Sequence, residues 1–216
     1  MSKLRFRYQT LEFGETDIHL RTLRDRQQFL DVDGVSEDLG ISSATWPLFG
    51  VVWQSSEVLA HLMSDFDIAG KRILEIGCGI GLPSLVLNHR LADITATDYH
   101  PEVENFLREN TRINEGNKIP FIRTGWADDK TDLGRFDLLL GSDLLYEQEH
   151  PELLADFLNQ HAKPNCEVII VDPGRKRHAK FSKQMISRGY QHSQSNPKDT
   201  DYLDKPFKGQ VIRYSR

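Results

Sequence analysis

Short apolar runs alternate with segments of helical periodicity along most of this chain. The runs are almost uninterrupted by polar residues, which is typical of strands covered on both faces, as in a parallel sheet. Their alternation with helices predicts consecutive βαβ units and a doubly wound α/β fold. The expected strands are 72–76, 94–97, 121–124, 136–140 and 168–171, and the expected helices are 57–64, 83–90, 101–113, 151–161 and 179–188. Proline stands where a first helical turn would begin in three of these helices, at Pro83, Pro101 and Pro151.

The two ends of the chain follow different patterns. Residues 7–13 and 17–23 alternate loosely on either side of a short turn, which predicts a β-hairpin. We therefore expect an N-terminal hairpin extension over residues 1–45 and one α/β domain over residues 46–216. Near the C-terminus the pattern is weaker, with one further expected strand at 210–214.

Composition excludes several classes of protein. The chain has 216 residues, 38% of them hydrophobic, which is enough for one buried core. No apolar run approaches the roughly 20 residues that cross a bilayer, and the basic N-terminus lacks the apolar segment of a secretory signal. Two cysteines are too few for a disulfide framework, and the eight histidines lack HxxxH or HExxH metal-site spacing. With a formal charge of −5, we expect a cytoplasmic monomer without a metal, a membrane anchor or a nucleic-acid partner.

A glycine-rich segment joins the first expected core strand to the helix after it. Gly77, Gly79 and Gly81 would let a ligand approach the backbone closely at a tight turn. The free N–H groups at the start of the helix favour an anionic ligand group. Asp98 comes 21 residues after Gly77, near the spacing at which an acidic residue meets ribose hydroxyls. This context predicts a cofactor that contains a nucleoside.

Two details distinguish between nucleoside cofactors. Leu82 replaces the third glycine of a dinucleotide fingerprint, and Gly81 comes one residue too early. The Glu75 carboxylate would be a poor neighbour for a pyrophosphate but a good one for a sulfonium and an ammonium group. Charge therefore favours S-adenosylmethionine over NAD. A nicotinamide-dependent oxidoreductase, whose Tyr-x-x-x-Lys signature is absent here, and an inactive binding module are the alternatives from other classes.

The segment from Glu75 to Gly81, with Asp98, resembles motif I and the acidic ribose site of class I, seven-strand S-adenosylmethionine-dependent methyltransferases. Further blocks between residues 45 and 175 resemble the methyltransferase-like protein lysine methyltransferases. They are Gly50-Val51-Val52-Trp53-Gln54, Thr97-Asp98, Gly125-Trp126 and Gly141-Ser142-Asp143-Leu144-Leu145-Tyr146. The resemblance implies a Rossmann-like, mostly parallel seven-stranded sheet with helices on both faces and an N-terminal hairpin. It also implies methyl transfer to a protein side-chain nitrogen.

The same resemblance implies which residues hold the cofactor. The implied cofactor-binding set is Trp53, Glu75, Gly77, Cys78, Gly79, Asp98, Trp126 and Ser142. In the family, the matching tryptophans line the pocket, the loop holds the methionine portion, the aspartate holds the ribose, and the serine lies beside the adenosyl group. Without the resemblance, both tryptophans would be interpreted as core aromatics. Cys78 is expected to be a small loop residue rather than a nucleophile, because no histidine is near it in sequence.

Asp143 and Tyr146 match the D-x-x-Y motif of the family, and they follow an expected strand whose carboxyl end should face the site. A lysine with an unperturbed pKa of about 10.4 is neutral in only about 1 of 2,500 molecules at pH 7, yet methyl transfer needs the neutral amine. The resemblance implies that Asp143 orients the incoming ammonium and that Tyr146 holds the amine after it loses its proton. The structural alternatives are a helix cap for Asp143 and a half-buried tyrosine at 146.

The remaining motifs concern the acceptor. The Asn-Pro-Pro-aromatic motif of enzymes that methylate adenine or glutamine amides is absent. Asp172-Pro173-Gly174-Arg175 is a turn signal, and it also resembles a string in the electron-transfer-flavoprotein lysine methyltransferases, so Arg175 could shape the substrate mouth. The basic run that starts at Arg175 would attract an acidic protein surface or form a solvated helix start. We expect a protein lysine as acceptor, with a small amine or a protein arginine as the alternative.

Overall fold

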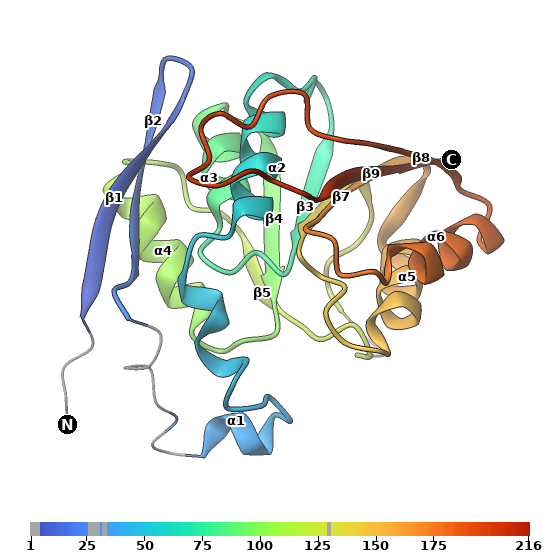
Figure 1. Cartoon of the computed structure of the whole chain (residues 1–216), viewed down its shortest axis with the longest axis horizontal. Helices are drawn as coiled ribbons and strands as arrows, with labels where there is room; N and C mark the ends of the chain where they lie inside the picture. The colour runs from blue at the N-terminus through green and yellow to red at the C-terminus, as the bar shows by residue number, and fades with distance from the viewer. Residues whose placement is uncertain (1–4, 26–30, 32–33, 129–130) are drawn as a thin grey trace.

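The centre of the molecule is a seven-stranded sheet (Figure 1). The computed structural model describes residues 5–25, 31, 34–128 and 131–216. The sheet strands are β3 (Arg72–Ile76), β4 (Asp93–Asp98), β5 (Phe121–Arg123), β6 (Phe136–Ser142), β7 (Ala162–Asp172), β8 (Gln191–Ser195) and β9 (Gln210–Ser215). Their order is β5-β4-β3-β6-β7-β9-β8, and β9 alone runs in the opposite direction to the other strands of the sheet. The expected mostly parallel, doubly wound sheet is confirmed.

Helices cover both faces of this sheet. The helices of the described residues are α1 (Val35–Asp38), the 3-10 helix η2 (Trp46–Gly50), α2 (Gln54–Asp65), α3 (Leu82–His89), α4 (Val103–Ile113), α5 (His150–His161) and α6 (His178–Ser187), of which α2 to α6 pack on the sheet. One buried cluster combines α2, α3 and α4 with one face of the sheet, and a second combines α5 and α6 with the other face. Neighbouring residues of β3 belong to different clusters, Ile73 to the first and Leu74 to the second. Burial on both faces explains the uninterrupted apolar runs.

The predicted hairpin is present and lies beside α4 (Figure 1). Its strands are β1 (Phe6–Phe13) and β2 (Thr16–Leu23), paired so that Phe13 faces Thr16. Ile18 and Leu20 of β2 are fully buried in the same cluster as α2, α3 and α4. The hairpin therefore extends the core of the α/β unit.

Several boundaries differ from the sequence-based predictions. Pro83 and Pro151 lie in the first turns of α3 and α5 as predicted, but Pro101 lies in a turn before α4, which begins at Val103. Strand β7 begins at Ala162, six residues before the expected start. Strand β8 was not predicted, because its five residues are all exposed and carry no apolar pattern. Backbone pairing with β9 defines it instead.

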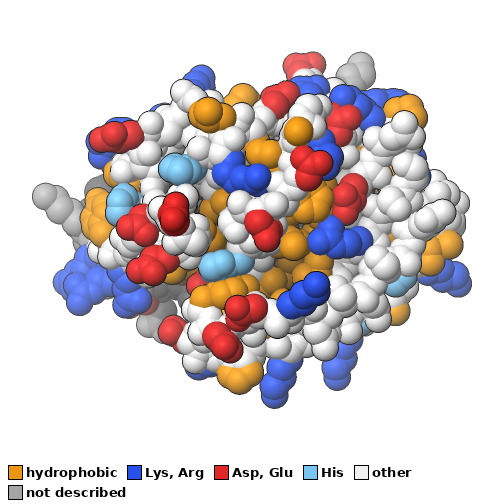
Figure 2. Space-filling model, turned by 90° about the horizontal axis from the view of Figure 1, so that it is seen from above, with side chains coloured by type: hydrophobic (Ala, Val, Ile, Leu, Met, Phe, Trp, Pro, Cys, Tyr) orange, Lys and Arg blue, Asp and Glu red, His pale blue; other side chains and the backbone are white. Residues whose placement is uncertain are grey.

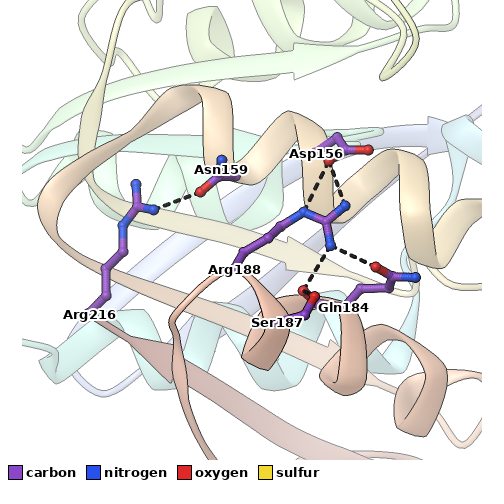
Figure 3. Close-up of polar contacts among 6 residues, drawn as sticks. All are labelled: Asp156, Asn159, Gln184, Ser187, Arg188 and Arg216. Atoms are coloured by element: carbon purple, nitrogen blue, oxygen red, sulfur yellow. Dashed lines mark hydrogen bonds and ion pairs between the residues drawn. The ribbon is translucent and has the colours of Figure 1, made fainter.

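A polar network holds α5 and α6 together (Figure 3). Arg188, directly after α6, donates from Nε and Nη2 to Oδ1 of Asp156 on α5 at 3.0 and 2.6 Å. Its Nη1 donates to the Gln184 side chain of α6 at 2.7 Å, and Arg216 Nη1 donates to Asn159 Oδ1 of α5 at 2.7 Å. These bonds hold together the helical layer that packs against β6 and β7.

Charged side chains of both signs are interspersed on the face seen in Figure 2, around a central area of hydrophobic side chains. Within the described part of the chain, no helix is long and apolar enough to cross a membrane.

Candidate active site

The glycine loop, residues 77–81, turns the chain from β3 into α3. Gly77 and Gly79 have positive φ angles of 61° and 53°, which side-chain-bearing residues rarely adopt. A Cβ atom at Gly77 would lie 2.6 Å from Leu144 Cδ2, and one at Gly79 would lie 3.0 Å from the Phe49 carbonyl oxygen. The loop thus needs glycine both for its conformation and for close contact with two other segments.

Glu75 lies in β3 just before this loop, and it is 1% exposed. Its Oε2 accepts hydrogen bonds from the Ser84 backbone N–H at 2.8 Å and from the Ser84 hydroxyl, both in the first turn of α3. Burial raises the pKa of Glu75 to about 8, against the lowering effect of the Ser84 bonds. Its charged form is therefore disfavoured until a positive charge comes near.

Asp98 ends the neighbouring strand β4. Its Oδ2 accepts a hydrogen bond from the Gly79 N–H at 2.9 Å, and its Oδ1 accepts one from the His100 N–H at 2.9 Å. Each carboxylate oxygen keeps a second lone pair for another donor, such as a hydroxyl of a ligand. Burial raises the pKa of Asp98, while the backbone hydrogen bonds lower it. The structure thus places Asp98 against the glycine loop.

The Cys78 thiol lies in the glycine loop, near the carboxyl groups of Asp98 and Glu75. It is buried, and burial together with Asp98 and Glu75 raises its pKa well above the usual value. The thiol therefore stays protonated at neutral pH, which does not suit a nucleophile. Burial is the main cause of this shift, and the neighbouring carboxyl groups of Asp98 and Glu75 add to it, which suits a cationic ligand better than a pyrophosphate.

The two tryptophans of the predicted set lie on different sides of the sheet. Trp53 precedes the first residue of α2, and its Nε1–H donates to the Leu48 carbonyl of η2 at 2.9 Å. Trp126 packs against the cluster covered by α5 and α6, and its ring centroid lies 4.8 Å from that of His150. Both rings are only partly buried. Trp46 is buried, and its ring centroid lies 4.1 Å from that of His100.

Ser142 and Asp143 stand at the carboxyl end of β6. Ser142 is the last residue of the strand and lies opposite Val171 of β7. Asp143 has a positive φ of 54°, and its N–H donates to the Val171 carbonyl at 2.9 Å. Its carboxylate forms a two-bond ion pair with Arg175, both bonds at 2.7 Å. This pairing replaces the helix cap considered as the structural alternative.

Tyr146 follows three residues later, with 42% of the residue exposed. Its ring makes an edge contact with His150, at a centroid distance of 4.6 Å. His150 in turn bonds the Leu144 carbonyl through Nδ1 at 2.7 Å. Desolvation and the carboxylates of Asp98, Glu147 and Asp143 raise the pKa of Tyr146 to about 12. The hydroxyl is therefore neutral at physiological pH.

Sequence reasoning missed two residues that support the site, His150 and Ser84. His150 joins Trp126 to Tyr146, and only its distance of four residues from Tyr146 could have suggested this. Ser84 donates hydrogen bonds to the buried Glu75 carboxyl group. The sequence hinted at this contact only by a hydroxyl residue at the start of the helix that follows Glu75. Over the described ranges, no group of three or more histidine, cysteine, aspartate or glutamate side chains could hold a metal ion.

Comparison with known proteins places this site in a family. A family model described as lysine methyltransferase matches residues 36–188. Protein N-lysine methyltransferase METTL21A of Danio rerio is 35% identical over 124 residues, which cover 52% of this chain and 56% of that protein. Histidine protein methyltransferase 1 homolog of Dictyostelium discoideum is 32% identical over 121 residues, 53% of this chain and 39% of that protein. The chain spans about half the length of these curated relatives.

A solved structure shows the same fold. The 16S rRNA N2 G1207 methyltransferase RsmC of T. thermophilus superposes with a TM-score of 0.67 and 12% identity, covering 99% of this chain and 51% of that one. The family model covers well over half of the chain, including the glycine loop and the Asp143–Tyr146 segment. The chain therefore belongs to the lysine methyltransferase family.

Proposed function

We propose that this chain binds S-adenosylmethionine and transfers its methyl group to a lysine side chain of a protein. The observation that carries the proposal is the contact between the glycine loop and the Asp143–Tyr146 segment. The missing side chain at Gly77 makes room for Leu144, so the glycine loop lies against the segment that carries Asp143 and Tyr146. A cofactor on the loop and an acceptor beside these two side chains would therefore be neighbours.

The residues at the loop fit a cationic cofactor. Burial disfavours the charged forms of Glu75 and Asp98, so a sulfonium and an ammonium group nearby would be stabilised by these carboxyl groups and would restore their charge. We assign cofactor binding to the loop residues Gly77, Cys78 and Gly79, to Glu75, Asp98 and Ser142, and to Trp53 and Trp126. When bound, S-adenosylmethionine supplies a methyl group that bonds to the amine nitrogen as its carbon–sulfur bond breaks.

The acceptor side needs a group that orients an ammonium and a group that holds the neutral amine. Asp143 has a side chain only 12% exposed, and its oxygens keep lone pairs beyond those used by Arg175. Tyr146 is partly exposed and has a neutral hydroxyl, whose oxygen can accept a bond from an amine N–H. The amine lone pair would then be left for the methyl group, and the released proton would leave to solvent past Tyr146.

The acceptor is the part of the proposal with alternatives. A small amine and a protein arginine would both present nitrogen at the same place. One relative is named for histidine and another for lysine, so membership of the family supports a nitrogen acceptor on a protein more strongly than lysine itself. The D-x-x-Y arrangement favours lysine, because a single compact ammonium suits one carboxylate oxygen and one hydroxyl.

The test is incubation of the purified chain with methyl-labelled S-adenosylmethionine and a lysate of the source organism that lacks the endogenous protein. We expect label in one or a few protein bands, recovered as methyl-lysine after hydrolysis. Recovery of methyl-arginine or methyl-histidine would show that the acceptor is arginine or histidine instead of lysine. Label confined to small molecules would show that the acceptor is a small amine. Failure of the chain to bind S-adenosylmethionine, measured by calorimetry, would remove the proposal.

A further inference from the structure

The ion pair between Asp143 and Arg175 joins the ends of two neighbouring strands. Arg175 Nε donates to Oδ1 of Asp143 and Nη2 donates to Oδ2, each at 2.7 Å. The side chain of Asp143 is 12% exposed, whereas that of Arg175 is 42% exposed. A guanidinium that engages both oxygens of a carboxylate holds it in one orientation and compensates its charge. The acid that would orient the acceptor is thus already paired.

The backbone around Arg175 is built to keep this pairing. Oδ1 of the buried Asp172, the last residue of β7, accepts the N–H groups of Gly174 at 2.7 Å and Arg175 at 3.0 Å. These bonds fix the turn that carries Arg175 toward β6. On the other side, the Asp143 N–H is bonded to the Val171 carbonyl of the same strand. Both partners are therefore positioned by the end of β7.

Several carboxyl groups lie around the pair, and the basic run 176–180 follows Arg175 in the chain. Asp98 of β4 and Glu147 interact with Tyr146, as do Asp143 and Arg175. Asp172 of β7 interacts with Arg175. His150 of α5 contacts the Tyr146 ring and lies 3.3 Å from the Glu147 carboxylate. Arg175 thus contributes positive charge where several carboxylates converge.

We propose that Arg175 is a positioning residue of the acceptor site, which neutralises Asp143 so that the substrate amine is held in its neutral, reactive form. The proposal rests on the proposed function. An unpaired carboxylate beside the amine would favour the ammonium, which has no lone pair for the methyl group. The paired carboxylate still accepts a hydrogen bond from the amine through its remaining lone pairs, so it orients the substrate without keeping it protonated.

This role separates binding from chemistry. Without Arg175, the ammonium form would bind Asp143 at least as well, and the pH needed to deprotonate the bound amine would rise. An opposite charge within a few ångströms shifts such a midpoint by about 1 unit or more. We therefore expect a lower rate at neutral pH, a recovery at high pH and no increase in KM.

The experiment uses Arg175→Gln in the full chain, with the unmethylated form of the acceptor protein identified by the labelling described above. Single-turnover rates at saturating S-adenosylmethionine and acceptor are measured from about pH 7 to about pH 11.5, a range that spans the midpoint of about 10.4 at which an ordinary lysine becomes neutral. We expect the midpoint of the pH profile to rise by about 1 unit, so that the rate at pH 7 falls about 10-fold. KM at pH 7 should be unchanged or lower.

Two further variants separate this effect from a general disturbance. Arg175→Lys keeps the charge but not the two-bond geometry, so the midpoint of its pH profile should lie close to that of the unmodified chain. Lys180→Gln removes a positive charge from the same basic run without touching Asp143, because Lys180 bonds the Gln148 carbonyl, and its midpoint should equal that of the unmodified chain. Thermal unfolding of each variant checks that the fold is intact.

The outcomes distinguish the two proposals. If the unmodified chain methylates lysine and Arg175→Gln lowers the rate equally at every pH, or leaves it unchanged, the role of Arg175 is overturned while the proposed function stands. If the unmodified chain transfers no methyl group to lysine, the proposed function fails, and the inference about Arg175 fails with it.

Discussion

The side chain of Asn114, the residue that follows α4, makes the backbone hydrogen bonds to His19 of β2 that a neighbouring strand would otherwise make. Its Oδ1 accepts the His19 backbone N–H at 2.8 Å, and its Nδ2 donates to the His19 carbonyl at 2.7 Å. Asn110, one turn earlier, accepts the Arg21 N–H at 2.7 Å. Two asparagine side chains thus satisfy the backbone edge of β2 and attach the hairpin to the α/β unit.

Asn114→Ala should loosen this attachment. The substitution leaves two backbone groups of His19 without their partner, and we expect the free energy of unfolding to fall by about 1–2 kcal/mol. Hydrogen exchange of the His19 amide should speed up more than that of amides in β3. Asn105→Ala is the matched control, because Asn105 lies on α4 and bonds only an exposed Arg108 side chain among the described contacts. Equal effects of the two substitutions would contradict the attachment.

Gly77→Ala should damage the site more than the same change at a glycine with a similar backbone. Gly70 has a φ of 68°, close to that of Gly77, but an added Cβ there meets nothing within 4 Å. Gly70→Ala should therefore lower the free energy of unfolding by only about 1 kcal/mol, the penalty for placing a side-chain-bearing residue in the left-handed conformation. Gly77→Ala adds a clash with Leu144, so we expect it to lower the free energy of unfolding by about 1–3 kcal/mol more than Gly70→Ala does. It should also weaken the binding of S-adenosylmethionine, measured by calorimetry. Similar losses in both variants would show that the contact with Leu144 has no role.

Glu75→Gln should change how stability depends on pH. Burial raises the pKa of Glu75 to about 8 in the folded chain, whereas its ordinary value is 4.5. The folded state then binds more protons than the unfolded state between these pH values, so the free energy of unfolding falls as pH rises through this window. Glu57, with a pKa raised to about 7 by burial, adds to the fall at lower pH.

The interval from pH 7 to pH 8 best isolates Glu75. We expect the unmodified chain to lose about 1 kcal/mol more than Glu75→Gln across it, measured by urea unfolding. The exposed Glu104, replaced by glutamine, is the control and should keep the pH dependence of the unmodified chain. A Glu75→Gln profile parallel to that of the unmodified chain would show that Glu75 does not titrate in this range.

Asp143→Asn and Tyr146→Phe should each remove methyl transfer while keeping cofactor binding. The loss of an orienting carboxylate or of the hydroxyl that holds the amine should lower turnover about 100-fold or more. Affinity for S-adenosylmethionine should stay near that of the unmodified chain, because neither side chain is assigned to the cofactor. Tyr8→Phe, at an exposed tyrosine of the hairpin, controls for the loss of a hydroxyl and should leave turnover unchanged. Normal turnover in both site variants would remove their assignment.

Local patterns in the sequence were sufficient to predict the layered fold. The strands β3 to β6 and helices α2 to α6 were predicted within a few residues, because an element buried on both faces or along one stripe must carry its periodicity in consecutive residues. The hairpin was predicted in the same way. Strand β8 was not, because an exposed edge strand needs only a partner backbone, which no local pattern records.

The motifs of the site were also local. The glycine loop, Asp98 and the Asp143–Tyr146 segment could be recognised because each is a short string at the end of a strand, and the carboxyl ends of parallel strands meet at one edge of the sheet. Their residue types and spacing indicated a nucleoside cofactor, and the resemblance to the family added the expectation of an amine acceptor.

The partners of these motifs were decided only by tertiary structure. Three contacts join residues from different elements. They are the hydrogen bonds from Ser84 to Glu75, the packing of Leu144 against Gly77, and the ion pair of Arg175 with Asp143, at separations of 9, 67 and 32 positions. Which groups meet depends on how the strands are ordered and on where each turn directs its side chains. The sequence by itself thus determined the elements and the chemistry that they carry, whereas the packing of those elements determined which charges are buried, paired or left to meet a substrate.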